Sequence, residues 1–543
     1  MPIILGITQG EHSSGIAIVS DNEIEVVLEE EKLNRVKSWK DFDKSFIRYP
    51  ILCLQSLKER YGADFTGFDA FTSFLPFEEV KKSFDQIGFE LPKDKFYQTD
   101  HHECHAFASY TLSGFTDKVL IFCADASGGN NDKSSRTYLA LNGQFISVES
   151  IDLARKSLGH FYAALTELLG FRRLRDEGKV VGMSGHGGFW QELYDVWNDI
   201  ILIKGVNTDP DLHPIESGGV YSLMYERFFK LVGSKYWKSQ KVLNDIAATG
   251  QYIFEEKVIE LLNNIHYKYE EYDRLCLSGG IFANVKLNKR ISELEWVKDL
   301  FVLPSMGDEG LALGSALITS ASIMGQKRLR AVKNMSFGNS YSEEEIEVDA
   351  KDVLGDYERV ELDLRQLAHL LSMKQIVGLF QGRSEHGARA LGNRSIICDA
   401  TSKEMYDILN KKLMRNDFMP FAPAVLEEDA DLIFDIKKGR HSAQFMTILY
   451  NTRPYYQNKI PVVVHPIDKT ARIQIVTAQS NTMFYNILKS YKSQTGLGLL
   501  VNTSFNIHDE PIVETPKEAF THLKNGIVDY IATDNYLYKK RGA

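Results

Sequence analysis

The chain has 543 residues, 44% of them hydrophobic and 25% charged, with a formal net charge of −10. At roughly 150 residues per domain this length predicts two to four domains, and the near-average composition excludes disordered and fibrous classes. The acidic balance argues against a nucleic-acid partner, because phosphate neutralisation needs a basic face. Five scattered cysteines without a CxxC pair fit a reducing compartment, so the cytoplasm is the expected location.

Apolar runs that end in polar turns recur along the chain and predict its strands. They lie at 3–7, 15–19, 23–29, 118–125 and from 274, where a helix is expected from about 283. Strands interleaved with helical stretches predict an α/β fold. The segment 326–360 lacks long apolar runs and is expected to connect two lobes, with a further α/β unit starting at 375–383. Neither a leader peptide nor a run of about 18 apolar residues occurs, so no membrane association is expected.

The segment DHHECHAFASY at 100–110 is the sharpest candidate for a metal site. His101 and His105 are four residues apart and would share one face of a helix, whereas His102 would point elsewhere. Further ligands must come from distant segments, and Asp125 and Asp308 both end such segments. The spacing alone leaves metal binding and an ordinary polar helix start both open. A site of two histidines and two carboxylates would suit iron, manganese or zinc.

Glycine-containing turns provide candidate anion sites. GEHSSG at 10–15, DASGG at 125–129 and SGG at 278–280 can each present backbone N–H groups to phosphate, and together they indicate one nucleotide cleft, although each alone reads as a tight turn. QGRSEHGARALGNRS at 381–395 interleaves arginines with glycines and predicts an anion-binding loop. NTSFN at 502–506 would add hydroxyls and amides, or is a polar turn.

EEEKLNRVK at 29–37, taken alone, predicts a solvated helix face with favourable charge pairs. It is nevertheless one of a collinear series of blocks that together resemble the NodU/CmcH family of O-carbamoyltransferases. The series also contains GEHSS, DHHECHA, FCADASGG, EGKVVGMSGHG, LSGGIFAN, PSMGDEGLALGSA, QGRSEHGARALGNRS, MPFAPAVL, ARIQIV and NTSFN. These blocks span nearly the whole chain.

The resemblance implies a fold and a reaction. It implies an N-terminal lobe at 1–340 with the actin-like ATPase (ASKHA, TsaD-like) fold, joined to a YrdC-like α/β lobe at 355–543. The second lobe would form carbamoyl adenylate from carbamoyl phosphate and ATP. The first would transfer the carbamoyl group to a hydroxyl of a small-molecule or glycan acceptor in a biosynthetic reaction. The resemblance does not name the acceptor.

Residue by residue, the resemblance assigns four groups of site residues. The metal ligands would be His101, His105, Asp125 and Asp308; the catalytic residues His12, as general base, and Lys37, opposite leaving-group charge; the nucleotide contacts Gly128, Gly279, Gly280 and Asn284; and the carbamoyl phosphate contacts Arg389, Arg394, Ser395, Arg472 and Ser504. Leu413 and Met419 stand where the family has basic residues, which leaves one phosphate contact open.

The implied co-substrate is ATP with Mg²⁺, and the implied cofactor is a divalent metal, with iron expected first and manganese or zinc as alternatives. The expected partners are carbamoyl phosphate and a hydroxylated acceptor, and a homodimer is compatible with the sequence. Two other functions are compatible with parts of the sequence: a tRNA threonylcarbamoyl-type transferase and a non-catalytic actin-like ATPase or chaperone. The acidic balance argues against tRNA, and the histidine pair and the second lobe argue against a chaperone.

Overall fold

The computed structural model describes residues 2–10, 13–37, 49–128, 133–141, 143–152, 157–198, 228, 230–231, 239–325, 330–415 and 419–541. Two five-stranded sheets form the N-terminal lobe. In spatial order, the first sheet consists of β3 (Glu23–Glu29), β2 (Gly15–Ser20), β1 (Ile3–Thr8), β4 (Ala70–Ser73) and β5 (Phe96–Gln98). The spatial order of the second is β8 (Gln144–Asp152), β7 (Lys133–Leu141), β6 (Val119–Ala124), β9 (Arg274–Ser278) and β10 (Asp299–Val302).

The two N-terminal sheets repeat one topology. In each, three consecutive strands pair antiparallel, and two later strands are added parallel to the first of the three. This duplication is the arrangement expected of an actin-like ATPase lobe. The α/β fold predicted from the sequence is therefore confirmed, and the strands predicted at 3–7, 15–19, 23–29 and 118–125 are present within a residue or two.

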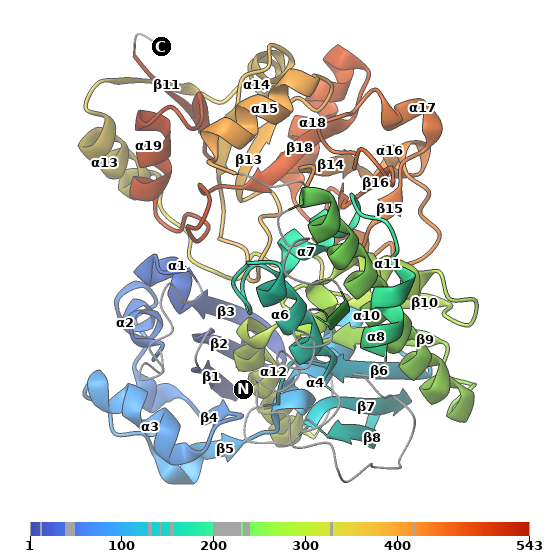
Figure 1. The fold of residues 1–543 in the computed structure, drawn as a ribbon. Helices are drawn as coiled ribbons and strands as arrows, with labels where there is room; N and C mark the ends of the chain where they lie inside the picture. Colours follow the sequence, from blue (N-terminus) through green and yellow to red (C-terminus); the bar gives the residue numbers. More distant parts are fainter. Residues whose placement is uncertain are drawn as a thin grey trace.

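Helices cover and separate these sheets (Figure 1). They are α1 (Glu30–Asn34), α2 (Ile51–Arg60), α3 (Phe77–Gln86), α4 (His101–Ser113), α6 (Leu158–Leu168), α7 (Glu177–Ser184), α8 (Gln191–Asn198), α10 (Gln240–Lys268), α11 (Val285–Ser292) and α12 (Leu311–Met324). Helix α12 is apolar almost all round and is buried because it packs on both β1 and α4. It thereby joins the two sheets into one lobe. None of the helices in the described ranges is long and apolar enough to cross a membrane.

The C-terminal lobe is built on an eight-stranded mixed sheet. Its spatial order is β11 (Tyr357–Glu361), β20 (Tyr536–Lys540), β19 (Tyr530–Ala532), β12 (Val377–Phe380), β13 (Arg394–Cys398), β18 (Leu499–Ser504), β14 (Ala422–Leu426) and β17 (Gln474–Val476). Its helices are α13 (Glu343–Leu354), α14 (Leu364–Ser372), α15 (Lys403–Lys412), α16 (Glu427–Ile433), α17 (Pro454–Gln457), α18 (Thr482–Thr495) and α19 (Pro516–Lys524). A short ribbon of β15 (Tyr450–Asn451) and β16 (Thr470–Ala471) lies beside the sheet (Figure 1).

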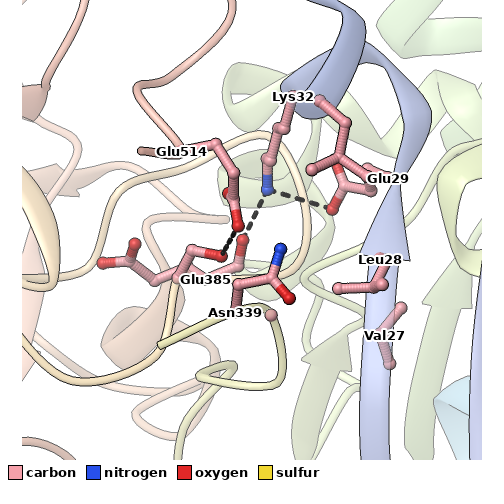
Figure 2. Close-up of a pocket in the computed structure, with 10 residues that line it drawn as sticks. Val27, Leu28, Glu29, Lys32, Asn339, Glu385 and Glu514 are labelled. Atoms are coloured by element: carbon pink, nitrogen blue, oxygen red, sulfur yellow. Dashed lines mark hydrogen bonds and ion pairs between the residues drawn. The ribbon is translucent and has the colours of Figure 1, made fainter. Parts of the chain in front are cut away.

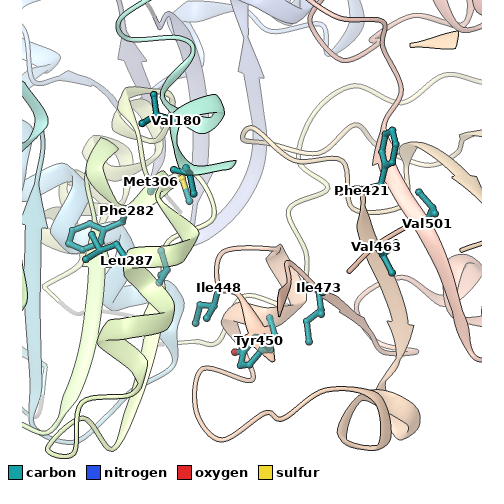
Figure 3. Close-up of a cluster of buried hydrophobic side chains, with 14 of the residues drawn as sticks. Val180, Phe282, Leu287, Met306, Phe421, Ile448, Tyr450, Val463, Ile473 and Val501 are labelled. Carbon is teal, nitrogen blue, oxygen red and sulfur yellow. The ribbon is translucent and has the colours of Figure 1, made fainter. Parts of the chain in front are cut away.

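One buried apolar cluster runs through both lobes. It includes Phe282 and Leu287 from the N-terminal lobe and Phe421, Ile448 and Val501 from the C-terminal lobe (Figure 3). Each of these side chains is at most 4% exposed, so burial of their apolar surface favours the packed arrangement of the two lobes. Side chains from distant parts of the sequence are therefore held at fixed positions along the lobe interface.

Candidate active site

Helix α4 brings His101 and His105 onto one face, as their spacing predicts. Asp100 caps the helix by accepting a hydrogen bond from Glu103 N at 3.0 Å, so the helix begins at His101. Both imidazoles are buried, at 3% and 0% exposure. The intervening His102 instead packs against Gly128, where an added Cβ would lie 2.2 Å from the His102 ring.

Two carboxylates complete this cluster. Asp125 follows β6, and Asp308 begins a 3₁₀ turn after β10. His105 Nε2 lies 3.4 Å from Asp308 Oδ1 and 3.5 Å from Asp125 Oδ2, and His101 Nε2 lies 3.6 Å from Asp308 Oδ1. One ligand atom from each of the four residues falls within 4.8 Å of every other. The structure thus brings together all four of the predicted metal ligands.

The burial and hydrogen bonding of the histidine ring nitrogens indicate whether a metal would fit between them. All four nitrogens of His101 and His105 are buried without a hydrogen-bond partner in the described part of the chain. Buried polar atoms are nearly always satisfied, so nitrogens that face two carboxylates at 3.4–3.6 Å fit a shared cation. Burial lowers the pKa of His101; burial has the same effect on His105, but Asp308 and Asp125 outweigh it and raise the pKa of His105.

The SGG turn after β9 holds one of these carboxylates. Gly279 adopts φ +97°, and a Cβ there would lie 2.0 Å from Ala124 O, so only glycine fits. The turn lets Gly280 N donate to Asp125 Oδ2 at 3.1 Å, while Ala126 N donates to Oδ1 at 2.7 Å. The predicted nucleotide-binding turn therefore also orients a predicted metal ligand.

Asn284 has local partners. Its Oδ1 accepts from Leu287 N at 3.1 Å, which caps α11, and it exchanges two hydrogen bonds with the Gln251 carboxamide at 3.0 and 3.1 Å. The side chain is 6% exposed. In this arrangement Asn284 stabilises the start of α11, and its predicted contact with a nucleotide stays a prediction.

A cluster of cations lies where the two lobes meet. Burial lowers the pKa of Lys37, and the charges of three arginines, Arg415, Arg175 and Arg389, lower it further. Burial and Arg415 lower the pKa of Arg389 to about 10. Burial, Arg389 and Arg415 also lower the pKa of Arg472. We call these five residues the basic cluster. Its mutual repulsion favours a bound polyanion.

Sequence reasoning named three of the five residues of the basic cluster. It missed Arg175, which precedes the EGKVVG block, and Arg415, which lies in the LMRNDFMPFAP block. A signal for Arg415 was available, because its block resembles a phosphate-binding segment of the family. No signal for Arg175 was available, because this residue is brought to the cluster by a contact with Asp509, 334 residues away.

The other predicted contacts of the C-terminal lobe occupy different positions. Arg394 is fully buried and donates to the carbonyl oxygens of Gln381 at 2.7 Å and Asn339 at 3.3 Å, with its guanidinium 3.9 Å from the Phe380 ring centroid. Ser395 is also fully buried, and its Oγ accepts from the backbone of the same loop. In this structure Arg394 thus stabilises the 381–395 loop through hydrogen bonds to its carbonyl oxygens.

Ser504 pairs with Ser395 across β18 and β13, and its side chain is half-buried at the end of the strand. The last predicted site residue, His12, lies outside the described residues.

The two departures from the family pattern differ in their surroundings. Leu413 is 0% exposed and belongs to the apolar cluster that joins the lobes, so a basic residue would not fit there. Met419 packs against Gly182 of α7 and lines an interlobe pocket together with Arg472. A basic side chain at this second position would face the pocket.

The EEEKLNR block is not the solvated helix face predicted from its charges alone. Glu29, Glu30 and Lys32 are 8%, 5% and 5% exposed. Glu30 accepts from the backbone of α2 at Leu52 and Cys53, and Arg35 donates to backbone carbonyls of 511 and 512 in the C-terminal lobe. The prediction was wrong because these charges are covered by other segments, which include α2 and residues 511–512 of the C-terminal lobe.

These sites define an α/β protein with a buried histidine–carboxylate cluster in one lobe and the basic cluster between its lobes. Comparison with known proteins makes the class specific. The family profiles described as Carbamoyltransferase N-terminus and Carbamoyltransferase C-terminus match residues 79–317 and 368–540. The chain therefore belongs to the carbamoyltransferase family, as the sequence motifs predicted, and it is a carbamoyltransferase.

Curated relatives align with this chain over most of their length. Nodulation protein NolO of Bradyrhizobium diazoefficiens is 30% identical, over 82% of this chain and 79% of its own. The Methanocaldococcus jannaschii protein MJ1051 is 30% identical over 99% of this chain and 100% of its own. Among solved structures, full-length HypF in its phosphate- and nucleotide-bound form aligns at 15% identity and a TM-score of 0.34, covering 60% of this chain and 56% of its own.

Proposed function

We propose that this carbamoyltransferase is ATP-dependent, forms carbamoyl adenylate, and transfers the carbamoyl group to a hydroxyl of a small-molecule or glycan acceptor. The observation that carries the proposal is the coexistence of two distinct sites in one chain. One is the histidine–carboxylate cluster of the N-terminal lobe, and the other is the basic cluster at the lobe interface. A single-step transfer would not need both.

The activation step is assigned to the basic cluster. Hydrolysis breaks the bond between the carbamoyl group and phosphate of carbamoyl phosphate and leaves carbamate. A carbamate oxygen then attacks the α-phosphorus of ATP, and pyrophosphate leaves with the bonding electron pair. Arg389 and Arg472 would neutralise the phosphate charge, and Ser504 at the end of β18 would donate a hydrogen bond. Both arginines are half-buried, so less water screens their charges than on an open surface.

The transfer step is assigned to the N-terminal lobe. The acceptor oxygen attacks the carbamoyl carbon, the bond to AMP breaks, and the acceptor proton moves to a base, for which we propose His12. Lys37, whose pKa is lowered by burial and by the arginines around it, would stabilise charge on the departing AMP. The glycine turns of residues 128 and 279–280 would face the nucleotide phosphates, with Mg²⁺ accompanying ATP.

A divalent metal held by His101, His105, Asp125 and Asp308 would supply a Lewis acid next to the reacting groups. We propose iron(II), because two imidazoles and two carboxylates are a ligand set that iron accepts, with manganese and zinc as the alternatives. Backbone amides of Ala126 and Gly280 hold the Asp125 carboxylate in place for this role.

The proposal is tested by pyrophosphate release from the purified full chain supplied with ATP, Mg²⁺ and carbamoyl phosphate. The expected result is release that requires carbamoyl phosphate, is lost in Arg472→Met, and persists in His101→Ala, which would then fail only in transfer to a hydroxylated acceptor. Release in the absence of carbamoyl phosphate would contradict the adenylate mechanism. If no release occurs, a panel of hydroxylated acceptors is added; continued absence with folded, metal-loaded protein rejects the proposal.

A further inference from the structure

The loop that carries Arg389 is built onto the N-terminal lobe and the connector between the lobes. Ser384 N donates to Asn339 O at 2.9 Å, and His386 N donates to Met335 O at 2.7 Å. Its turn at Gly387 has φ +98°, and a Cβ there would lie 3.3 Å from Pro304 O in the segment that leads to Asp308. The position of Arg389, two residues further on, therefore depends on how this turn is held.

Lys32 and Glu29 also hold the turn, through side-chain contacts. Lys32 Nζ donates to Glu385 O, lies 3.5 Å from Gly387 O, and pairs with Glu29 Oε1 at 3.1 Å. Glu29 Oε1 accepts from Gly387 N at 2.6 Å and lies 2.8 Å from His386 Nδ1. The two side chains thus contact both the carbonyls and an amide of the 385–387 turn. Figure 2 shows Lys32 between Glu29 and Glu385, with Glu514 of the C-terminal lobe nearby.

Both members of this pair are charged although they are buried. Burial lowers the pKa of Lys32, but Glu29 and Glu514 raise it above its ordinary value. Burial likewise raises the pKa of Glu29, but Lys32 and His386 bring it down to about 2. A buried ion pair is weak support for stability, because an apolar pair of similar size often packs as well. What an apolar pair cannot supply is directed hydrogen bonding to both ends of a turn.

We propose that Lys32, together with Glu29, is a positioning element that fixes the 385–387 turn and thereby directs Arg389 into the basic cluster. The N-terminal lobe then prepares the anion site of the C-terminal lobe without touching the anion itself. The effect on carbamoyl phosphate rests on the proposed function. The effect on anion binding is independent of the proposed function, because anion binding needs no catalysis.

The test compares Lys32→Met with Lys82→Met in the full chain. Lys82 pairs with Glu79 at the same three-residue spacing, at 2.8 Å, but both side chains are exposed and far from the loop in sequence. The first measurement is the affinity for inorganic pyrophosphate by titration calorimetry, beside a thermal melt. We expect Lys32→Met to weaken pyrophosphate binding about tenfold, because small misplacements of a contact group are costly, and Lys82→Met to leave it unchanged.

The second measurement separates positioning from loss of structure. In the pyrophosphate-release assay, Lys32→Met should raise the KM for carbamoyl phosphate more than it lowers kcat, and n-propylammonium should partly restore the KM of Lys32→Ala by refilling the ammonium position. If Lys32→Met does not fold, Glu29→Gln takes its place, since it keeps the shape and removes the charge; weakening of roughly threefold is then expected.

Each outcome decides the inference. Folded Lys32→Met that binds pyrophosphate within about twofold of the unmodified protein would overturn it, since a displaced contact group should cost more than that. An unmodified protein that binds no pyrophosphate would overturn it as well. If the unmodified protein binds pyrophosphate but shows no activity with carbamoyl phosphate, the proposed function fails while the positioning role is still read from the calorimetry.

Discussion

Arg175 of the N-terminal lobe donates to Asp509 of the C-terminal lobe, with 2.7 Å between Nη2 and Oδ1. The arginine side chain is 6% exposed and the aspartate side chain 38%, so the arginine end of the ion pair is buried and the aspartate end is solvent-exposed. The same guanidinium lowers the pKa of Lys37. The pair therefore joins the lobes, and it holds the Arg175 charge where it acts on Lys37 of the basic cluster.

Replacing this arginine should change the titration of Lys37. In Arg175→Met one of the charges that lower its pKa is gone, so the pKa of Lys37 should rise, and less of the amine is neutral at a given pH. The free energy of unfolding should fall by less than about 1 kcal/mol, because the pair is partly solvated. Trace acetylation across pH followed by mass spectrometry of the Lys37 peptide measures the pKa. Arg173→Met, at a side chain that is partly exposed, is the control.

The metal site gives a prediction with a control on the same helix. His105→Ala removes a ligand and should lower metal affinity by more than about 100-fold, since loss of even an outer-shell partner of a ligand costs roughly 10 to 100-fold. His102→Gln, beside it on α4 but outside the ligand set, should keep its metal. Metal content after dialysis is measured by mass spectrometry. Equal metal loss in both variants would mean that α4 itself is disturbed, and equal retention would remove His105 from the site.

The metal ligands His101 and His105 on α4 could be predicted from the sequence because their relation is local: residues four apart on a helix lie on the same face. Asp125 and Asp308 were candidates because each ends a segment distant from α4, but only the family resemblance assigned them to the site, since nothing in their own segments encodes that they converge. The burial of Lys32 was missed for a physical reason. A run of alternating charges looks the same whether it faces water or a loop, and here the covering residue Glu385 is 353 positions away.

Glu29 should make stability depend on acid pH. Its pKa is about 2 in the folded protein and 4.5 as an ordinary glutamate, so the stability it contributes is complete above about pH 4.5 and is lost as the pH falls toward 2. The difference in free energy of unfolding between the unmodified protein and Glu29→Gln should be on the order of 3 kcal/mol near neutrality. Denaturant unfolding from about pH 6 to about pH 3 measures it. A difference that stays constant over this range would show that the carboxylate charge is not the cause.

A basic residue should destabilise the protein at position 413 but not at position 419, the two positions that depart from the family pattern. Leu413→Lys places an amine in the apolar cluster and should lower the free energy of unfolding by at least about 3 kcal/mol, whereas the volume-conserving Leu413→Met should cost less than about 1.5 kcal/mol. Met419→Arg can extend its stem along Gly182 and its charge into the pocket shared with Arg472. It should change stability by less than about 1 kcal/mol and tighten pyrophosphate binding. Denaturant unfolding and calorimetry measure both effects. Weaker binding by Met419→Arg would mean that repulsion from Arg472 exceeds the attraction to the anion, and that this chain lacks a basic residue at 419 because Arg472 already fills that role.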